Sequence, residues 1–148
     1  INELVGNVFG DVRRSVAGEG IAFTLDLAPD LPMIRIDYRQ MAYCIKKILF
    51  NSLDAMIPPG ELSVTTRIDG DDILVEIRDT AARPARGDGA MVSHPALEKR
   101  DETENLELYF CRVILENYCK SFTVEEYEGK GTLYLIRLPR KKEEEHHE

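Results

Sequence analysis

Few side chains in this sequence have the type and spacing that covalent or metal chemistry needs. The three cysteines, Cys44, Cys111 and Cys119, form no Cys-x-x-Cys pair, which excludes the ligand spacing of a zinc ribbon. Three thiols also cannot all pair as disulfides, so we expect reduced, mostly buried cysteines. The sequence has no Gly-x-x-x-x-Gly-Lys-Ser/Thr phosphate loop, no serine or cysteine triad and no cluster of metal ligands. Its chemistry must be sought among amide, carboxylate and ammonium side chains.

Four such side chains stand out, and each also has a purely local explanation. Lys47 lies one helical turn before Asn51. A protonated lysine neither coordinates a divalent cation nor acts as a general base, although it can contact a phosphate as a point charge. The simpler interpretation is a solvated or salt-bridged helix lysine. Taken alone, Asn51 is interpreted as a partly exposed helix residue. Asp79 is interpreted as a residue that forms a turn at the end of a strand. Glu107 is interpreted as an acidic residue that stabilises a helix N-terminus.

The composition of the chain sets limits on its partners. The 148 residues are 43% hydrophobic and 31% charged, which is typical of one globular domain with its own core. The net charge of −8 argues against a general nucleic-acid binder and against docking on an anionic membrane. No apolar run approaches the roughly 20 residues of a membrane span, and no signal peptide is present, so we expect a cytoplasmic protein. Because the chain begins at Ile1, we expect it to be part of a longer protein.

Hydrophobic periodicity predicts three helices and six strands. The helices are expected over Asn2–Val16, over a segment that Asp37 caps and that runs to about Ile57, and over Glu104–Tyr118. The third helix is expected to bury Leu106, Tyr109, Phe110, Val113 and Ile114. The expected strands are Ile21–Leu27, Met33–Ile36, Leu62–Ile68, Ile73–Asp79, Phe122–Tyr127 and Leu133–Leu138.

Two segments lack such periodicity. Residues 80–102 contain two glycines, two prolines and many charges, and we expect a long, lid-like surface loop. Residues 140–148 are expected to form a charged, flexible tail. The order of elements predicts an α/β (α+β) two-layer sandwich over residues 1–139, in which three helices cover one face of a mixed, mostly antiparallel sheet. This sheet has five strands, with room for one extra short strand.

Two segments together resemble the ATP-binding domain of sensor histidine kinases, in the GHKL group of ATPases. The run Asn51-Ser52-Leu53-Asp54-Ala55-Met56 is similar to the N box of that family, and the closing run Glu128-Gly129-Lys130-Gly131-Thr132 is similar to its terminal Gly-x-Gly-Thr hairpin. The resemblance covers nearly the whole chain, from Ile1 to Pro139. It implies the Bergerat-type GHKL ATPase fold.

The resemblance also implies roles for residues that match the family motifs. Asn51 matches the asparagine that coordinates Mg²⁺, which prefers oxygen ligands, and Asp54 belongs to the same box. Asp79 matches the aspartate that accepts a hydrogen bond from the adenine amino group, with Thr132 beneath the ring and Gly131 beside it. The implied cofactors are ATP and Mg²⁺. The implied partners are an upstream helical hairpin that carries the phosphoacceptor histidine and a response regulator or other signalling protein.

The nucleotide loops depart from the family pattern. The family has Asp-x-Gly-x-Gly after its adenine aspartate, whereas this chain has Asp79-Thr80-Ala81-Ala82-Arg83. The family has Gly-x-Gly-x-Gly before its last helix, where bare backbone amides hold the phosphates; here the positions are Thr103, Asn105 and Glu107. Lys47 occupies the position of a second asparagine or of a catalytic glutamate. No catalytic residue is assigned.

Two functional readings follow from this comparison. In the first, the domain has lost or weakened ATP binding and serves as a signalling or interaction module. In the second, it is an active kinase domain whose loop cations replace the lost glycine amides; these cations are Arg83, Arg86, Lys99 and Arg100. None of the three histidines of the chain lies on an amphipathic helix as a phosphoacceptor would; they are His94, His146 and His147.

Overall fold

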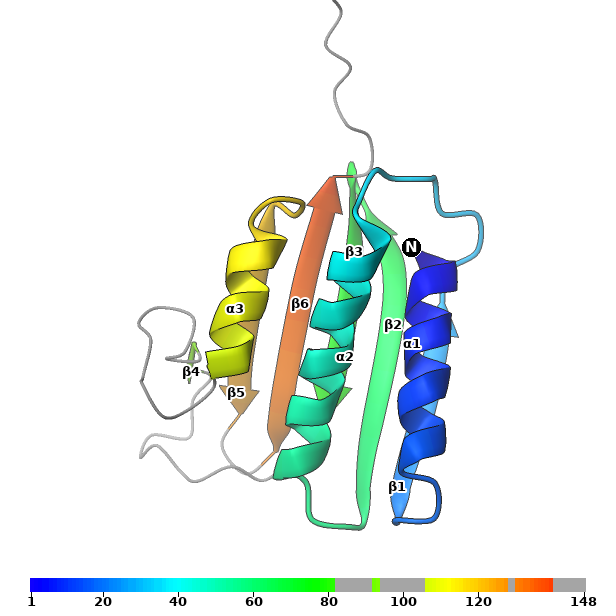
Figure 1. The fold of residues 1–148 in the computed structure, drawn as a ribbon, viewed down its shortest axis with the longest axis vertical. Coiled ribbons are helices and arrows are strands. Elements are labelled where there is room, and N and C mark those ends of the chain that lie inside the picture. Colours follow the sequence, from blue (N-terminus) through cyan, green and yellow to red (C-terminus); the bar gives the residue numbers. More distant parts are fainter. Residues whose placement is uncertain (82–91, 94–105, 128–129, 140–148) are drawn as a thin grey trace, which may run out of the picture.

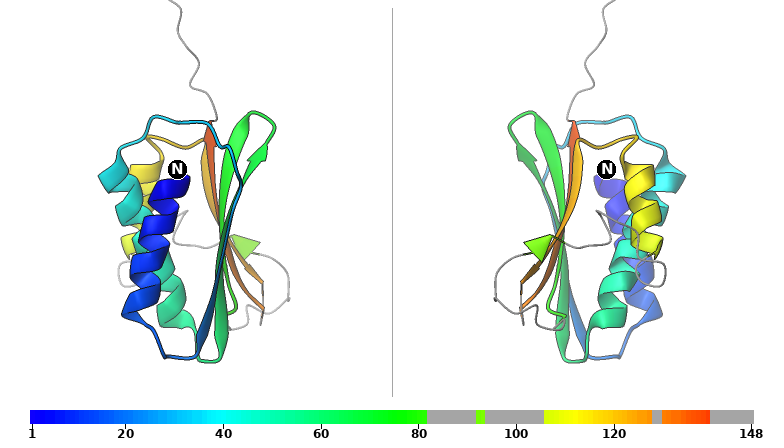
Figure 2. Two further views of the ribbon diagram at one scale, coloured as in Figure 1. Left: turned by 90° about the vertical axis from the view of Figure 1, so that its right-hand side faces the viewer. Right: turned by 90° about the vertical axis from the view of Figure 1, so that its left-hand side faces the viewer.

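Three helices cover one face of a sheet in the computed structural model, which describes residues 1–81, 92–93, 106–127 and 130–139. Side views show the helical layer and the sheet as two separate layers (Figure 2). In the helical layer, α2 lies between α1 and α3 (Figure 1). The helices are α1 (Asn2–Ser15), α2 (Tyr38–Ala55) and α3 (Leu106–Leu115).

The sheet is mixed, with the strand order β1-β2-β3-β6-β5-β4. The pair β1–β2 is parallel and the other neighbours are antiparallel. The predicted α/β sandwich with five long strands is therefore confirmed. The short sixth strand lies at Val92–Ser93, within residues 80–102, where a loop was expected. The strands are β1 (Ile21–Leu27), β2 (Gly60–Asp69), β3 (Asp72–Asp79), β4 (Val92–Ser93), β5 (Ser121–Tyr127) and β6 (Gly131–Pro139).

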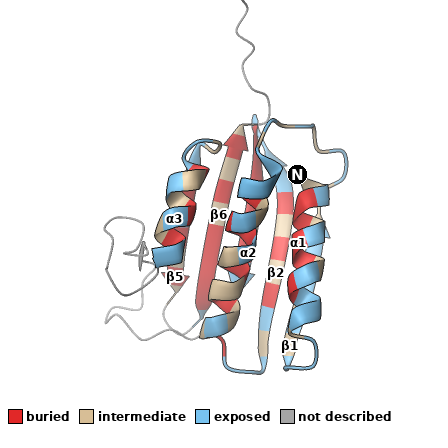
Figure 3. Cartoon of the chain, in the orientation of Figure 1, coloured by how far each residue is buried: buried red, intermediate tan, exposed pale blue. Residues whose placement is uncertain are grey.

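The core lies between the two layers, where the inner faces of the helices meet the sheet (Figure 3). The side chain of Asp37 accepts a hydrogen bond from the Gln40 backbone N–H at 3.0 Å, so the predicted N-cap of α2 is confirmed. From there α2 buries residues at three- and four-residue steps. These are Met41, Cys44, Ile45, Ile48, Leu49 and Ser52.

The predicted buried face of the third helix is wrong in part. Tyr109 and Ile114 are half-buried, and Ile114 packs against the core. The residues of α3 that are buried are Leu108, Cys111 and Leu115. Leu106, Phe110 and Val113 are 41%, 49% and 47% exposed. Apolar residues occupy both faces of this short helix, so its hydrophobic pattern alone does not determine which face is buried.

The predicted strand Met33–Ile36 is also wrong. No strand in the described part of the chain pairs with this segment, although Ile34 and Ile36 pack against the core and Arg35 between them is exposed. The alternation is real, but it belongs to an extended connection between β1 and α2. The expected lid and tail fall almost entirely on residues 82–91, 94–105 and 140–148, which lie outside the described residues. No helix within the described part of the chain is long and apolar enough to cross a membrane.

The central strands β3 and β6 meet in an unusually close backbone contact at one end. Asp79 pairs with Thr132 at this point, and Gly131 has a φ of +116°. A Cβ atom on Gly131 would lie 2.0 Å from the Asp79 carbonyl oxygen. Only glycine can therefore occupy position 131 without a backbone shift.

We predict that Gly131→Ala destabilises the chain by about 3 kcal/mol or more, because backbone strain and a backbone clash add together. Gly70→Ala is the matched control: Gly70 also has a positive φ, of +64°, but a Cβ there would have no atom within 4 Å. This control should cost only about 1–2 kcal/mol. Urea unfolding of the two variants measures both losses, and equal losses would contradict the proposed clash.

Candidate functional site

The site residues that the family resemblance implies come from α2, from the end of β3 and from the start of β6. Asn51 lies half-buried in the last turns of α2, and Asp54 is exposed one turn further on. Asp79 and Thr132 are each 1% exposed. The fold therefore brings Asn51, Asp79, Gly131 and Thr132 to the same end of the sandwich, with Asp54 at its edge.

Asn51 is held by a tyrosine of the central sheet. Its side-chain amide donates a hydrogen bond to the Tyr134 hydroxyl, with 2.7 Å between Nδ2 and the oxygen. Tyr134 is fully buried in β6. A buried tyrosine usually requires a hydrogen-bond partner for its hydroxyl, and Asn51 is that partner here. The contact ties α2 to β6, and it gives Asn51 a structural role in the absence of any ion.

Asp79 is also used by the fold. Its Oδ1 accepts hydrogen bonds from the backbone N–H groups of Ala81 and Thr132, each at 3.0 Å. The first bond turns the chain at the end of β3, and the second adds to the pairing with β6. Thr132 and Tyr134 are two residues apart, so Asp79 and Asn51 both bind the same short stretch of β6.

Lys47 forms an ion pair with Glu107 across the α2–α3 interface. The distance from Lys47 Nζ to Glu107 Oε2 is 3.3 Å, and the ammonium also lies 5.5 Å from the centre of the Tyr43 ring. The side chains of Lys47 and Glu107 are 31% and 64% exposed. The prediction of a salt-bridged helix lysine is confirmed. Two departures from the family motifs therefore meet and neutralise each other.

Two contacts between Cys44 and Cys111 join the same helices, about one helical turn away from the ion pair. The Sγ of Cys44 lies 3.8 Å from the Cys111 carbonyl oxygen, and the Sγ of Cys111 lies 3.8 Å from the Cys44 carbonyl oxygen. A hydrogen bond between the thiols raises the pKa of Cys111, as do burial and the nearby Glu107, and the same bond lowers the pKa of Cys44. Burial raises the pKa of Cys119 to about 11. All three cysteines are free thiols, as predicted, and Cys119 is only partly buried.

The described residues fit ATP and Mg²⁺ poorly. Lys47 lies on the same face of α2 as Asn51, so its ammonium would repel a divalent cation bound there. Glu107 places a carboxylate where the family has a bare glycine. The loop cations, Thr103 and Asn105 lie outside the described residues.

Sequence reasoning missed the role of Tyr134, although one signal pointed to it. Tyr134 falls at an inward position of the alternating pattern in the last strand, and its buried hydroxyl needs a partner. The sequence gives no indication that this partner is Asn51, 83 positions earlier.

No protein-family model matches this chain. It is 28% identical over 120 residues to sporulation kinase E of Bacillus subtilis, a match that covers 80% of this chain and 16% of that protein. It is 22% identical over 132 residues to the alginate biosynthesis sensor protein KinB of Pseudomonas aeruginosa, covering 88% of this chain and 21% of KinB. The chain thus spans about a fifth or less of these two curated relatives.

The structural comparison agrees with the sequence comparison. The catalytic domain of histidine kinase ThkA superposes with a TM-score of 0.79 at 17% identity, covering 96% of this chain and 94% of that one. These matches confirm the resemblance to sensor histidine kinases. The chain has the fold of a histidine-kinase catalytic domain.

Proposed function

We propose that this chain is the catalytic-domain part of a two-component sensor histidine kinase in which ATP binding is lost or much weakened. In this role the domain acts as a signalling and interaction module. The observation that carries the proposal is the Lys47–Glu107 ion pair. By the motif resemblance, these two residues stand at positions that the family uses for ion binding and phosphate binding.

The electrostatics of this pair work against a nucleotide. Two like charges about 4 Å apart repel by roughly 4 kcal/mol at an effective dielectric near 20. That energy corresponds to about three decades of affinity. The Glu107 side chain is 64% exposed, so water reduces the repulsion that an incoming phosphate meets. A phosphate would still have to compete with Glu107 for the Lys47 ammonium. The glycine residues whose backbone amides bind the phosphates in the family are also replaced in this chain.

The retained motif residues do not by themselves argue for activity. Gly131 is required by the backbone contact with Asp79, and the Asp79 carboxylate holds the β3–β6 junction. Asn51 has the Tyr134 hydroxyl as its partner. Each of these residues contributes to the fold whether or not a nucleotide is present.

The alternative is an active kinase domain, which is supported by the gathering of Asn51, Asp79, Gly131 and Thr132 at one end of the molecule. In that case Asn51 would hold Mg²⁺, Asp79 would hold adenine, and the γ-phosphate would pass in line to a histidine of an upstream helical hairpin. Loop cations would then replace the lost amide donors.

In either case, the proposed partners are that upstream hairpin of the same protein and a response regulator, and the proposed location is the cytoplasm. ThkA has been crystallised in complex with the response regulator TrrA, and this chain superposes on that kinase with a TM-score of 0.74 at 15% identity, covering 95% of this chain and 40% of ThkA.

We predict that calorimetric titration with ATP or ADP, with and without Mg²⁺, gives no saturable binding with a Kd below about 1 mM. Circular dichroism of the same sample establishes that the chain is folded. Saturable binding that is stronger than this and that Asp79→Asn abolishes would contradict the proposal and support the active reading.

A second prediction concerns the ion pair itself. Glu107→Gln should increase ATP affinity by about tenfold or more, because it removes the carboxylate and leaves the Lys47 ammonium free for a phosphate. Lys47→Gln should give no gain, and the double variant should bind more weakly than Glu107→Gln alone. Glu116→Gln, which removes a carboxylate paired with Arg112 on the turn after α3, is the matched control and should have no effect. If Glu107→Gln and Glu116→Gln behave alike, the ion pair does not block the site.

A further inference from the structure

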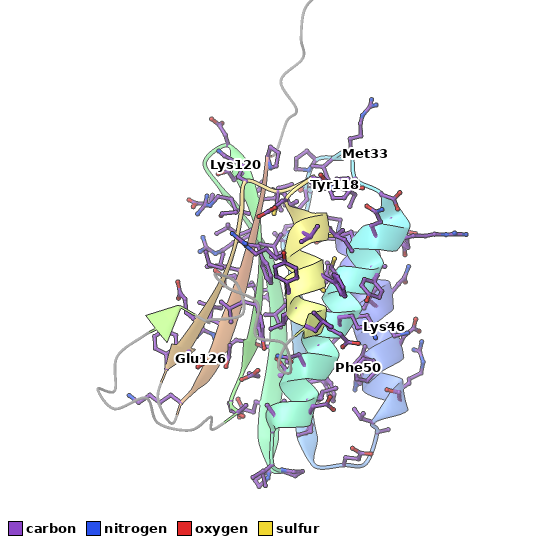
Figure 4. The ribbon with its side chains drawn as sticks, turned by 60° about the vertical axis from the view of Figure 1, so that its left-hand side comes forward. Met33, Lys46, Phe50, Tyr118, Lys120 and Glu126 are labelled. Carbon is purple, nitrogen blue, oxygen red and sulfur yellow. The ribbon has the colours of Figure 1, made fainter. Side chains whose placement is uncertain are left out.

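The strand β1 forms one edge of the sheet. In the described part of the chain it pairs with β2 alone. It has seven residues, whereas β4, the outermost strand at the opposite edge, has two. That opposite edge lies beside β5, whose two ends are marked by Lys120 and Glu126 (Figure 4). Viewed from the β1 side, α1 lies beside the strand in the helical layer and not over its edge (Figure 2, left). The β1 edge is therefore the longer of the two edges of the sheet.

The backbone groups that point away from β2 belong to the odd-numbered residues of β1. The Gly60 N–H donates to the Gly20 carbonyl oxygen at 3.3 Å, and the Ala28 N–H donates to Thr66 Oγ1 at 2.9 Å. Residues 20 and 28 therefore direct backbone groups toward β2. The even-numbered residues between them do the same, because the direction alternates along a strand. The N–H and C=O groups of the remaining residues point to the open edge; these residues are Ile21, Phe23, Leu25 and Leu27.

The features that usually prevent pairing at a sheet edge are few in β1. Natural edge strands are often protected by a proline, a bulge or several charged side chains. The register between β1 and β2 is uninterrupted from Ile21 to Leu27, and Asp26 is the one charged residue of the strand. Leu25 is 37% exposed, although it lies on the same, inner face of the sheet as Phe23. The edge thus offers both main-chain hydrogen bonds and apolar surface.

We propose that β1 pairs with β1 of a second copy of this chain, antiparallel, about a two-fold axis at Thr24. Phe23 of each copy then lies opposite Leu25 of the other, and Ile21 lies opposite Leu27. Apolar residues therefore meet at every inner position, and Leu25 becomes covered. The backbone groups of these same residues point outward, so each pair exchanges main-chain hydrogen bonds. This inference goes beyond the proposed function and does not depend on nucleotide binding.

The outer face of the strand identifies the occupant as a second copy. About the same axis, Thr24 lies opposite Thr24, which is a favourable cross-strand pair. Asp26 of each copy lies opposite Ala22 of the other, so no like charges face each other within the strand. The strand is therefore complementary to itself over its whole length. Since each chain has one such edge, the pairing closes after two copies.

The helix α1 leaves room for a second copy beside β1. The two sheets continue into each other in this arrangement, with both helical layers on the same side. A Cβ atom on Gly6 would lie 3.9 Å from Leu27 Cδ1, so this flank of α1 borders β1. Gly10 lies one turn further along the same flank, and a Cβ there would contact a side-chain nitrogen of Arg14 at 3.4 Å. Neither contact requires a glycine, and glycine is unfavourable within a helix. The flank that faces the second copy thus carries no side chain at two successive turns.

Charges outside the strand oppose the pairing weakly. Each chain has a net charge of −8. The register brings Glu19 of each copy toward the end of the strand near Asp30 of the other, and Arg13 is exposed on the flank of α1 in both copies. These repulsions join exposed groups and are screened beyond about 8 Å at physiological salt. Because the pairing rests on main-chain hydrogen bonds and apolar contacts, added salt should strengthen it.

Sedimentation equilibrium of the chain at concentrations from about 1 µM to 1 mM tests the proposal. We expect a monomer–dimer equilibrium within this range, because pairing of two edges makes a small interface. Raising the salt concentration from about 0.05 M to 0.5 M should lower the dissociation constant by at least about twofold.

Variants of Leu25 test the role of the backbone. Leu25→Pro removes an N–H that points to the open edge and no hydrogen bond to β2, so the fold should tolerate it. It should raise the dissociation constant by at least about tenfold. Leu25→Ala, which keeps the N–H, is the matched control and should raise it less. Circular dichroism checks that both variants are folded.

Variants of Thr24 test the position of the axis. Thr24→Lys and Thr24→Glu should each raise the dissociation constant by at least about threefold, because like charges then face each other. An equimolar mixture of the two variants should associate more tightly than either alone. Thr123→Lys, at an exposed position of β5, makes the same change away from the proposed interface and should have no effect.

Four results would overturn the proposal. The first is a chain that stays monomeric over the whole concentration range. The second is a dimer that Leu25→Pro leaves intact, and the third is an equal effect of Thr24→Lys and Thr123→Lys. The fourth is a dimer that added salt dissociates, which would assign the association to charged surfaces elsewhere on the molecule.

Discussion

The backbone contact between Gly131 and Asp79 is the constraint on which this end of the molecule depends. Since Gly131 has no Cβ, β6 can begin against the carbonyl of the last residue of β3. That start sets the register in which Thr132 donates to the Asp79 carboxylate. Two residues further along β6, the Tyr134 hydroxyl meets Asn51 of α2. One glycine thereby positions both the central sheet pairing and the helix that faces it.

Because of this arrangement, residues that match a nucleotide-binding motif also have a role in the fold. Asn51, Asp79, Gly131 and Thr132, which match the nucleotide-binding motifs, all take part in the β3–β6–α2 connection, so their presence alone does not indicate an activity. The two described residues that depart from the motifs, Lys47 and Glu107, contact each other instead. Lys47 and Glu107 are opposite in charge and in contact, which compensates two substitutions that would each leave a charge without a partner between neighbouring helices.

Patterns along the chain could predict elements, but not the contacts between them. The Asp37 cap and the alternation of the long strands are local signals, and the structure confirms them. The Met33–Ile36 alternation is equally clear, but strand formation also requires a neighbouring strand, and none of the described strands pairs with this segment. Three of the five residues predicted to line the inner face of α3 are exposed, because apolar residues occupy both faces of this helix. The Asn51–Tyr134 and Lys47–Glu107 contacts join distant segments, and only the fold brings them together.

The Lys47–Glu107 ion pair also affects the distribution of positive charge on α2. This helix carries cations at positions 39, 46 and 47, but only Lys47 lies within reach of α3. Pairing with Glu107 therefore neutralises the one of these three cations that faces the neighbouring helix. The contact joins α2 to α3 without leaving a net charge between them, so both positions can differ from the family pattern while the helical layer stays intact.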